Sequence, residues 1–317
     1  MTDCPKTLLE AVRYFADEAL CQEYMRRIKW PDGKVTCPKC GGESTSPVKN
    51  RPLIQCNNRE CKRQFSYKTG TIFEGSPLPL GHWFVAIWSI ANCKNGISSH
   101  ELARALGVTQ KTAWFMLHRI RLAMQSGTFR KLEGEVESDE TFVGGKAKNM
   151  HKSKREKRIT GRGAVGKAIV QGILQRGGEV RTMVVRDTEG ETLRGNVMRN
   201  VDRRATVYTD AHTSYDGLSR SFLHLTVDHI TEYVRGRVHT NGMENFWSLF
   251  KRALKGTYTH VAPWHLHRYA AEQTFRFNQR LSGDAGRFCN LLGRVLGKRL
   301  TYRQLAAVGD CGFMGIK

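Results

Sequence analysis

Two closely spaced pairs of cysteines near the start of the chain constrain its fold more than any other feature. The four residues are Cys37 and Cys40 in a CPKC motif, and Cys56 and Cys61 in a CNNREC motif. Two thiolate pairs on separate turns give the tetrahedral coordination of a structural Zn²⁺ site, and four thiolates leave no open position for catalysis. Residues 47–55 between the pairs suit hairpin strands, and Phe65 follows where it can cover the site. We therefore predict a zinc ribbon with a structural zinc ion.

The charge balance of the chain indicates a polyanionic partner. Its 317 residues include 51 Lys and Arg against 29 Asp and Glu, which gives a net charge of +22 and a pI near 9.9. This excess favours nucleic acid. No segment approaches the roughly 20 apolar residues of a membrane span, and the N-terminus lacks a signal-peptide pattern. We therefore expect a cytoplasmic protein without a membrane partner, in which the remaining cysteines are ordinary reduced thiols: Cys4, Cys21, Cys93, Cys289 and Cys311.

Changes in pattern along the chain divide it into four parts. Apolar residues recur at helical spacing over residues 7–29, which predicts one or two short helices before the zinc ribbon. The expected parts are an N-terminal helix and zinc ribbon at 1–72, a helical DNA-binding region at 73–130, a catalytic domain at 131–283 and a C-terminal segment at 284–317. The length has room for about two ordinary domains and a small module.

The segment GISSHELARALGVTQKTAWFMLHRIRLAM has the layout of a helix-turn-helix. It predicts a first helix at 99–106, a turn at Gly107 and a second helix from about Thr109. The first residues of the second helix, among them Lys111 and Thr112, would then face DNA. The alternative is a helical hairpin that does not contact DNA, and the basic charge of the chain favours the DNA-binding interpretation.

From Gly134 onward the chain alternates short apolar runs with turns, a pattern typical of strands. The runs predict, in order, strands at 136–143, 167–174 and 180–185, a helix at 191–199, a strand at 205–210 and a helix from Asn241. This order matches a ribonuclease-H-like core, in which the first and fourth strands are neighbours and a later helix crosses beside them. We therefore expect an α/β fold, with a ribonuclease-H-like catalytic core preceded by the zinc ribbon and the helix-turn-helix.

Three carboxylates are placed to converge within a few ångströms in this core. Asp139 and Asp210 lie at or near the ends of strand-like runs, and carboxylates at strand ends present the hard oxygen ligands that Mg²⁺ prefers. Glu244 and Lys251 lie seven residues apart on one stripe of an amphipathic helix, which suits a metal ligand and a lysine that binds a nearby phosphate. Alone, this pair is more typical of a solvated helix edge. The two aspartates favour a metal site.

A basic insertion separates the first two predicted strands. From Lys146 to Lys167 it contains nine Lys or Arg residues and one acid, Glu156. One interpretation is a solvated run of charge. The other is a clamp on the DNA backbone, because each phosphate that is neutralised releases counterions. On the second interpretation the contacts come from Lys146, Lys152, Lys154, Arg155, Lys157 and Arg158.

Five long motifs resemble those of the zinc-ribbon-bearing DDE transposases of bacterial insertion sequences, of the ISXO type. They are RIKWPDG leading into CPKC, KTGTIFEGSPLPL, SDETFVGGK, YTDAHTSY and HTNGMENFWSLFKRALKGTYTHV, and they run through almost the whole chain. The resemblance implies a ribonuclease-H-like fold with metal ligands at Asp139, Asp210 and Glu244, and a following basic residue at Lys251. Asn241, one helical turn before Glu244, is an alternative third ligand. We prefer Glu244 because a charged oxygen binds Mg²⁺ better than an amide does.

The function implied by this resemblance is that of a transposase, a two-metal polynucleotidyl transferase. Two Mg²⁺ or Mn²⁺ ions roughly 3.5–4 Å apart would share Asp139, with Asp210 and Glu244 each completing one coordination sphere, and would serve both cleavage and strand transfer. The zinc ribbon and helix-turn-helix would bind terminal inverted repeats in double-stranded DNA, and the joint handling of two ends predicts a homodimer or higher oligomer. Two alternatives remain: a DNA-binding regulator whose carboxylates are structural, and a nuclease of the same fold that does not join DNA.

Overall fold

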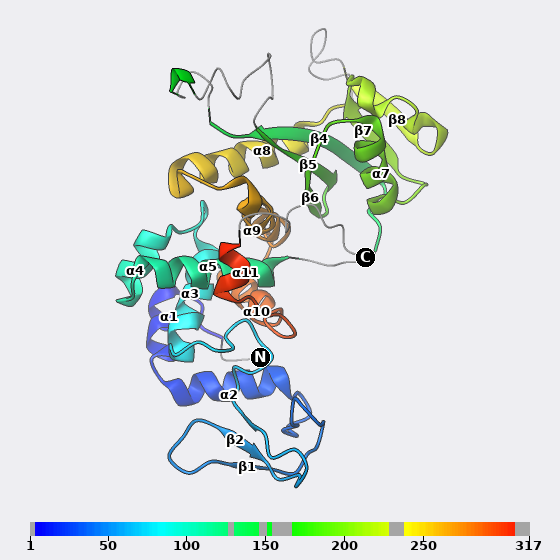
Figure 1. Cartoon of the computed structure of the whole chain (residues 1–317). Helices are drawn as coiled ribbons and strands as arrows, with labels where there is room; N and C mark the ends of the chain where they lie inside the picture. Colours follow the sequence, from blue (N-terminus) through cyan, green and yellow to red (C-terminus); the bar gives the residue numbers. More distant parts are fainter. Residues whose placement is uncertain (1–3, 126–129, 146–150, 154–166, 228–237, 308–317) are drawn as a thin grey trace. The chain divides into compact units, whose positions relative to one another are not determined.

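The computed structural model describes residues 4–125, 130–145, 151–153, 167–227 and 238–307 (Figure 1). These residues group into two compact units. The first contains the described residues up to Gln125 together with Gln279–Ala307, and the second contains the described residues from 130 to Asn278. Within these ranges no helix is long and apolar enough to cross a membrane.

The first unit begins with short helices, as the apolar spacing predicts. Helix α1 (Leu8–Phe15) is capped by Thr7 and α2 (Glu18–Lys29) by Asp17, each through a side-chain oxygen that accepts a bond from the first-turn backbone. Short antiparallel strands follow at β1 (Thr45–Pro47), β2 (Ile54–Cys56) and β3 (Gln64–Phe65). Strands β1 and β2 form the hairpin expected between the cysteine pairs, and Phe65 is buried in one cluster with Cys37 and Cys56, as predicted.

The rest of the first unit, as far as it is described, is helical. Its helices are α3 (Leu80–Asn92), α4 (Ser99–Leu106), α5 (Gln110–Met124), α10 (Asp284–Leu292) and α11 (Tyr302–Ala306). Helix α4 ends at Gly107, whose φ of +66° is the left-handed conformation that favours glycine, and Thr109 caps α5. The two helices expected on either side of Gly107 are therefore confirmed.

Helix α10 is not among the predicted elements, although its buried residues Phe288, Leu291 and Leu292 recur at helical spacing. Phe288 packs against Trp88 of α3, with ring centroids 5.5 Å apart. On the same helix, Cys289 lies with its Sγ 2.8 Å from the Sγ of Cys4, a proximity that their separation in the sequence hides.

The second unit is built on a mixed sheet. Its described strands are β4 (Glu135–Val143), β5 (Ala168–Gln175), β6 (Val180–Val185), β7 (Thr206–Asp210) and β8 (Leu223–Val227), in the spatial order β6-β5-β4-β7-β8. The pairs β4–β5 and β5–β6 are antiparallel, whereas β4–β7 and β7–β8 are parallel. The prediction that the first and fourth strands are neighbours is confirmed. Strand β8 is missed because its sequence, LHLTV, is short and mostly half-exposed or exposed.

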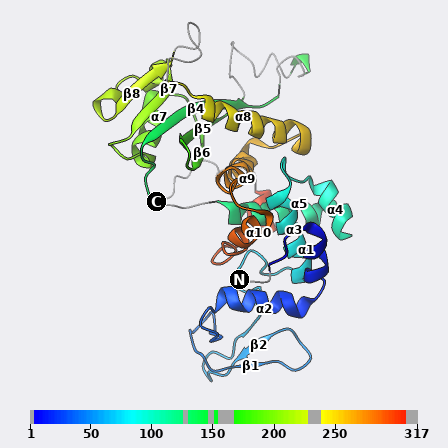
Figure 2. The same cartoon turned by 180° about the vertical axis from the view of Figure 1, so that it is seen from behind.

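Helices cover both faces of the sheet (Figures 1 and 2). On one face, α7 (Gly190–Asn200) packs through Leu193 and Val197 against strand residues that include Ile173. On the other, α8 (Asn241–Ala253) and α9 (Leu266–Asn278) pack against residues that include Leu174. Adjacent residues of β5 thus point to opposite cores, as the period of a strand requires.

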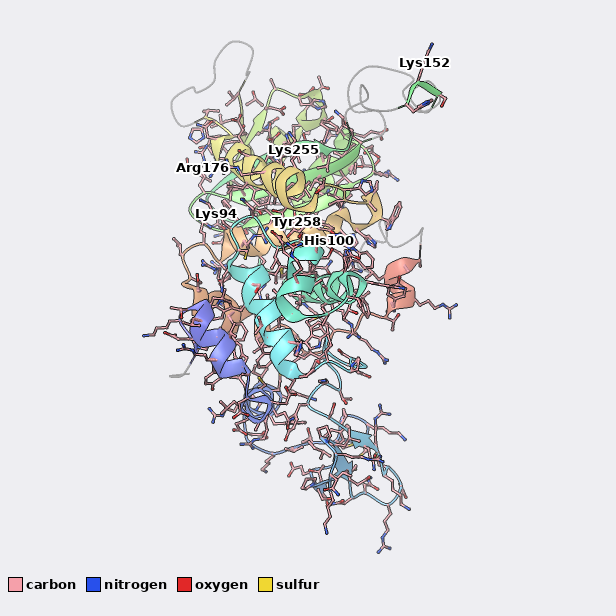
Figure 3. All side chains as sticks on the ribbon, turned by 90° about the vertical axis from the view of Figure 1, so that its left-hand side faces the viewer. Lys94, His100, Lys152, Arg176, Lys255 and Tyr258 are labelled. Atoms are coloured by element: carbon pink, nitrogen blue, oxygen red, sulfur yellow. The ribbon has the colours of Figure 1, made fainter. Side chains whose placement is uncertain are left out.

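The far end of α8 is anchored to α9. Helix α8 continues into a π-helical turn at Leu254–Tyr258, which carries Lys255 and Tyr258 (Figure 3). The Tyr258 hydroxyl donates to the carboxylate of Glu272 on α9, and Arg276 forms an ion pair with the same buried carboxylate.

Candidate active site

Asp139 and Asp210 lie on neighbouring parallel strands at one edge of the sheet. The parallel register ends with Glu137 paired to Tyr208, so Asp139 and Asp210 each lie two residues beyond this last pair on their strands. Beyond Glu137, strand β4 pairs only with β5, and Asp210 is the last residue of β7. The two strands therefore part at the level of the aspartates, where a ligand can approach both side chains.

Two glycines allow α8 to lie close to the strands. Gly172 is the β5 partner of Asp139, and a Cβ atom there would lie 2.8 Å from Cζ2 of Trp247. A Cβ atom at Gly242, in the first turn of α8, would lie 2.8 Å from Oε2 of Glu137. Side chains do not tolerate such contacts, so glycine is required at both positions for this approach.

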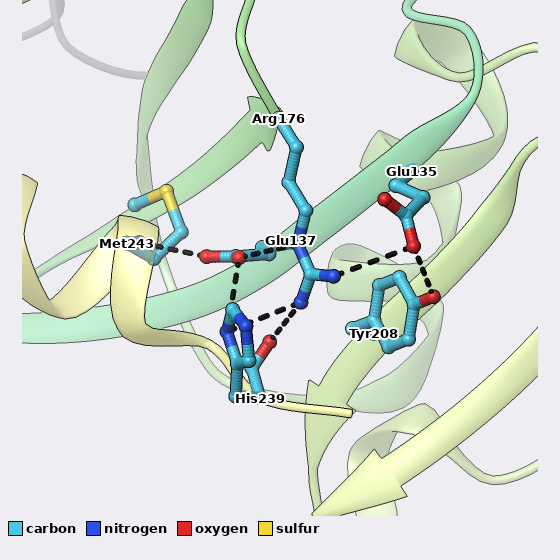
Figure 4. Close-up of polar contacts among 6 residues, drawn as sticks. All are labelled: Glu135, Glu137, Arg176, Tyr208, His239 and Met243. Atoms are coloured by element: carbon cyan, nitrogen blue, oxygen red, sulfur yellow. Dashed lines mark hydrogen bonds and ion pairs between the residues drawn. The ribbon is translucent and has the colours of Figure 1, made fainter. Parts of the chain in front are cut away.

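A charged network joins the start of α8 to the sheet (Figure 4). Glu137 is only 1% exposed, and its carboxylate accepts a bond of 2.9 Å from the backbone N–H of Met243 in the first turn of α8. Thr240 makes no side-chain capping bond, so Glu137 satisfies a donor that a cap would otherwise serve. Arg176 pairs with Glu137 at 2.8 Å and donates a bond of 2.7 Å to the carbonyl oxygen of His239.

The same arginine extends the network to β7. Its guanidinium lies 4.1 Å from the ring centroid of Tyr208, and the Tyr208 hydroxyl donates a bond of 2.8 Å to Glu135. Glu135, Glu137 and Asp139 are alternate residues of β4 and share the face that α8 covers. Helix α8 is therefore fixed in register with the strand that carries Asp139.

Hydrogen bonds from two elements hold the Asp139 carboxylate. Its Oδ1 accepts a bond of 2.8 Å from the backbone N–H of Glu140, and its Oδ2 accepts a bond of 3.0 Å from Nε1 of Trp247 on α8. Burial raises the pKa of Asp139 to about 6, and the negative charges of Asp210 and Glu244 add to the rise. The site thus gathers negative charge at low solvent exposure, which favours a cation.

Asp210 contributes a buried carboxylate oxygen that is not satisfied. No donor among the described residues reaches its Oδ1. A buried polar atom without a partner costs free energy, and a bound cation would recover it. The carboxylates therefore fit a hard divalent ion such as Mg²⁺.

The remaining predicted catalytic residues lie on the surface of α8. Asn241, Glu244 and Lys251 are all exposed. Glu244 is close enough for its charge to raise the pKa of Asp139. However, in the described part of the chain Asp139, Asp210 and Glu244 do not form a group whose ligand atoms all lie within 4.8 Å of one another. The expectation that these three carboxylates converge within a few ångströms is therefore not met, although Asp210 and Glu244 are near enough to raise the pKa of Asp139.

Glu140 is a further carboxylate near the site that the sequence analysis does not identify. Burial raises its pKa to about 8, and the charges of Asp139 and Asp210 contribute to this rise. Its carboxylate accepts a bond from the hydroxyl of buried Tyr215, which also lies 3.1 Å from the Ser138 hydroxyl. An acidic residue in a strand next to a predicted ligand is the signal that would have found it.

The four predicted zinc ligands do come together. The Sγ atoms of the four cysteines all lie within 4.8 Å of one another, with Cys37–Cys61 at 3.7 Å and Cys40–Cys56 at 3.6 Å. Thiolates about 2.3 Å from a tetrahedral zinc ion lie about 3.8 Å apart. The cluster therefore supports a structural Zn²⁺ ion.

The predicted DNA contacts fall only partly within the described residues. In the first turn of α5, Lys111 is exposed and Thr112 is half-buried. Thr112 donates its backbone N–H to the Thr109 hydroxyl at 3.2 Å, and Lys152 is exposed (Figure 3). The other predicted contacts lie outside the described residues: Lys146, Lys154, Arg155, Lys157 and Arg158.

Known proteins resemble the chain in both units. Residues 131–278 match the sequence profile of the ISXO2-like transposase domain, and residues 16–64 match that of the transposase zinc-ribbon domain. An uncharacterised protein in transposable element ISH50 of Halobacterium salinarum is 30% identical over 256 residues, which cover 77% of this chain and 85% of that protein. An uncharacterised transposase-like protein of Haemophilus influenzae is 34% identical over 101 residues, which cover 32% of this chain and 81% of that protein. The matched domains contain the cysteine cluster and the carboxylates, and they imply DNA binding. The chain therefore belongs to the family of ISXO2-like transposases.

Proposed function

We propose that the chain is a DDE transposase, which binds the terminal inverted repeats of an insertion sequence and catalyses metal-dependent strand cleavage and strand transfer. The observation that carries this proposal is the proximity of Asp139 and Asp210, each two residues past the last pair of parallel strands β4 and β7, to helix α8, which bears Glu244 and is bonded to β4. Carboxylates that serve only the fold are satisfied by donors or by cations. The Oδ1 of Asp210 has no donor among the described residues. A role as a cation ligand therefore explains this buried oxygen better than a purely structural role does.

The donor set suits divalent cations. Asp139, Asp210 and Glu244 would hold two Mg²⁺ or Mn²⁺ ions, with Asn241 as the alternative to Glu244 in the first turn of the same helix. When bound, such ions supply Lewis acidity that activates a water or a 3′-hydroxyl for attack and stabilises the leaving oxygen.

The other side chains orient the site and bind DNA. The bonds from Glu140 and Trp247 fix the Asp139 carboxylate, and a pKa of about 6 leaves it mostly ionised at neutral pH. Lys251 lies two turns after Glu244 on the exposed face of α8, where it would bind a phosphate that flanks the scissile bond. Helix α8 thus carries both a ligand and a phosphate contact.

The topology supports a ribonuclease-H-like core. The first three strands form an antiparallel set, the fourth lies parallel beside the first, and a later helix packs across them. This arrangement is the one expected for that core.

The first unit would recognise the transposon ends. Helices α4 and α5 would act as a helix-turn-helix in which Lys111 and Thr112 face the major groove, with the zinc ribbon beside them on double-stranded DNA. The basic insertion that contains Lys152 would bind the backbone. The protein would work as a homodimer or higher oligomer on DNA, in the cytoplasm where the DNA is.

A strand-transfer assay tests the proposal. The reaction contains zinc-loaded protein, a labelled duplex that ends in the element's terminal repeat, a supercoiled target and Mg²⁺. We expect joined product with the unmodified protein and with Asn241→Ala, and none with Asp139→Asn or Glu244→Gln. A gel-shift assay serves as the control, because all four proteins should bind the end equally. Cleavage without joining would indicate a nuclease, and binding without either step would indicate a regulator; each result contradicts the proposal.

A further inference from the structure

Trp247 connects the helix of the site to the first aspartate. Its indole N–H donates to Oδ2 of Asp139 at 3.0 Å, although 108 residues separate the two in the sequence. The ring is only 4% exposed and packs against Phe246 and Phe250, with centroids 5.1 and 6.1 Å away. Neighbouring aromatic rings and the space left by Gly172 thus determine where the N–H points.

The chemistry of the donor is suited to a metal ligand. An indole N–H donates one hydrogen bond, carries no net charge and does not accept a bond. A lysine or arginine at this position would neutralise Asp139 and compete with a cation. Each Asp139 oxygen receives one neutral N–H, since Oδ1 is bonded by the backbone of Glu140. The carboxylate is therefore oriented while its charge stays available.

The position of Trp247 on α8 adds a second consequence. Trp247 follows Glu244 by three residues, about one helical turn, so the two side chains are neighbours on α8, with Trp247 on its buried side and Glu244 on its exposed side. A bond from Trp247 to Asp139 therefore sets the distance between the strand and the part of α8 that bears Glu244.

We propose that Trp247 is a positioning residue, which orients Asp139 for divalent-cation binding and sets the spacing between Asp139 and Glu244. This inference rests on the proposed function. Hydrogen-bond partners of metal ligands typically contribute about 10–100-fold to metal affinity. Because the backbone of Glu140 still holds Oδ1 when Trp247 is changed, we expect an effect near the lower end of that range.

The test measures Mn²⁺ binding to the zinc-loaded, full-length protein by electron paramagnetic resonance, together with the Mg²⁺ concentration that gives half-maximal strand transfer. Trp247→Phe keeps the aromatic packing and removes the donor. Replacement of Trp247 by 3-benzothienylalanine keeps the ring shape and removes the N–H alone. The matched control is Trp83→Phe, which deletes an indole bond of 3.2 Å from buried Trp83 to Ser76 in the first unit.

We expect both changes at Trp247 to weaken Mn²⁺ binding about tenfold and to raise the Mg²⁺ requirement by a similar factor. Trp83→Phe should leave both quantities unchanged, even where it lowers thermal stability as much as Trp247→Phe does. Unchanged Mn²⁺ affinity in both Trp247 variants would overturn the inference while the metal site stands. Asp139→Ala separates the two proposals: if it binds Mn²⁺ as the unmodified protein does, the proposed metal site fails, and the role of Trp247 fails with it.

Discussion

Replacement of Gly172 by alanine should destabilise the second unit and loosen the contact between α8 and β4. The new Cβ atom would lie 2.2 Å from Cε of Met243, the end of a flexible side chain, and 2.8 Å from Cζ2 of Trp247, which is 0.6 Å inside the 3.4 Å at which ordinary contacts begin. Both partners are fixed, because Gly172 is paired in the sheet with Asp139 and Trp247 is buried among aromatic rings. Overpacking of this kind costs about 1–3 kcal/mol.

Urea denaturation of the zinc-loaded protein measures this loss. We expect the free energy of unfolding to fall by about 1–3 kcal/mol, and the Tm to fall by about 2–12 °C for a unit of this size. The matched control is Gly195→Ala on α7, where the nearest atom to the new Cβ is Arg199 Nη2 at 3.7 Å. That variant should be more stable by about 0.5–1 kcal/mol, because alanine favours a helix over glycine. If Gly172→Ala is as stable as the unmodified protein, α8 does not pack as closely against β5 as the structure shows.

Three other predictions concern pH, zinc and salt. Without added Mg²⁺, Asp139→Asn should gain stability relative to the unmodified protein as the pH rises from about 4 to 6, by up to about 3 kcal/mol in urea unfolding. The sign follows from the raised pKa of Asp139, about 6: in this pH range the folded state still holds a proton that the unfolded state has released, so the unmodified protein loses stability as the pH rises. If the free energies of unfolding of the two proteins differ by the same amount at every pH in this range, the raised pKa is wrong. Removal of zinc with a chelator, or Cys56→Ser, should unfold the hairpin of β1 and β2 and abolish binding of the transposon end, as measured by circular dichroism and gel shift. Lys111→Gln should lower the slope of log affinity for DNA against log salt by about 0.9, whereas an unchanged slope would mean that Lys111 contacts no phosphate.

Local patterns predicted most of the elements. The apolar spacing, the glycine at 107 and the alternation from residue 136 gave helices and strands that the structure contains at nearly the same bounds. The cysteine cluster followed from spacing alone, because a zinc ligand set is encoded within 25 residues, Cys37 to Cys61. Strand β8 is defined mainly by its pairing with β7, which its short sequence does not reveal. Helix α10 was missed although Phe288, Leu291 and Leu292 recur at helical spacing.

The sequence predicted the candidate metal ligands but not the residues that hold them in place. Asp210 stands out because it ends a strand-like run, whereas Asp139 lies in the middle of β4 and not near a strand end as expected. The supporting contacts join segments that are distant in the sequence, and they involve Glu137, Arg176 and Gly172. The ion pair of Glu137 with Arg176 at the start of α8 produces no periodic pattern that a sequence could reveal. Glu140 has a weak sequence signal, an acid next to a predicted ligand, but its burial and its bond from Tyr215 are visible only in the structure.

The most direct test of a metal-dependent transposase site is metal rescue of Asp210→Cys in the strand-transfer assay. Thiolates bind Mg²⁺ poorly and bind softer ions such as Mn²⁺ better. If Asp210 is a ligand, Asp210→Cys should join no DNA in Mg²⁺ and should regain activity in Mn²⁺, whereas Asp210→Ser should stay inactive in both. Full activity of Asp210→Cys in Mg²⁺, or equal loss in both metals, would contradict the role of Asp210 as a metal ligand.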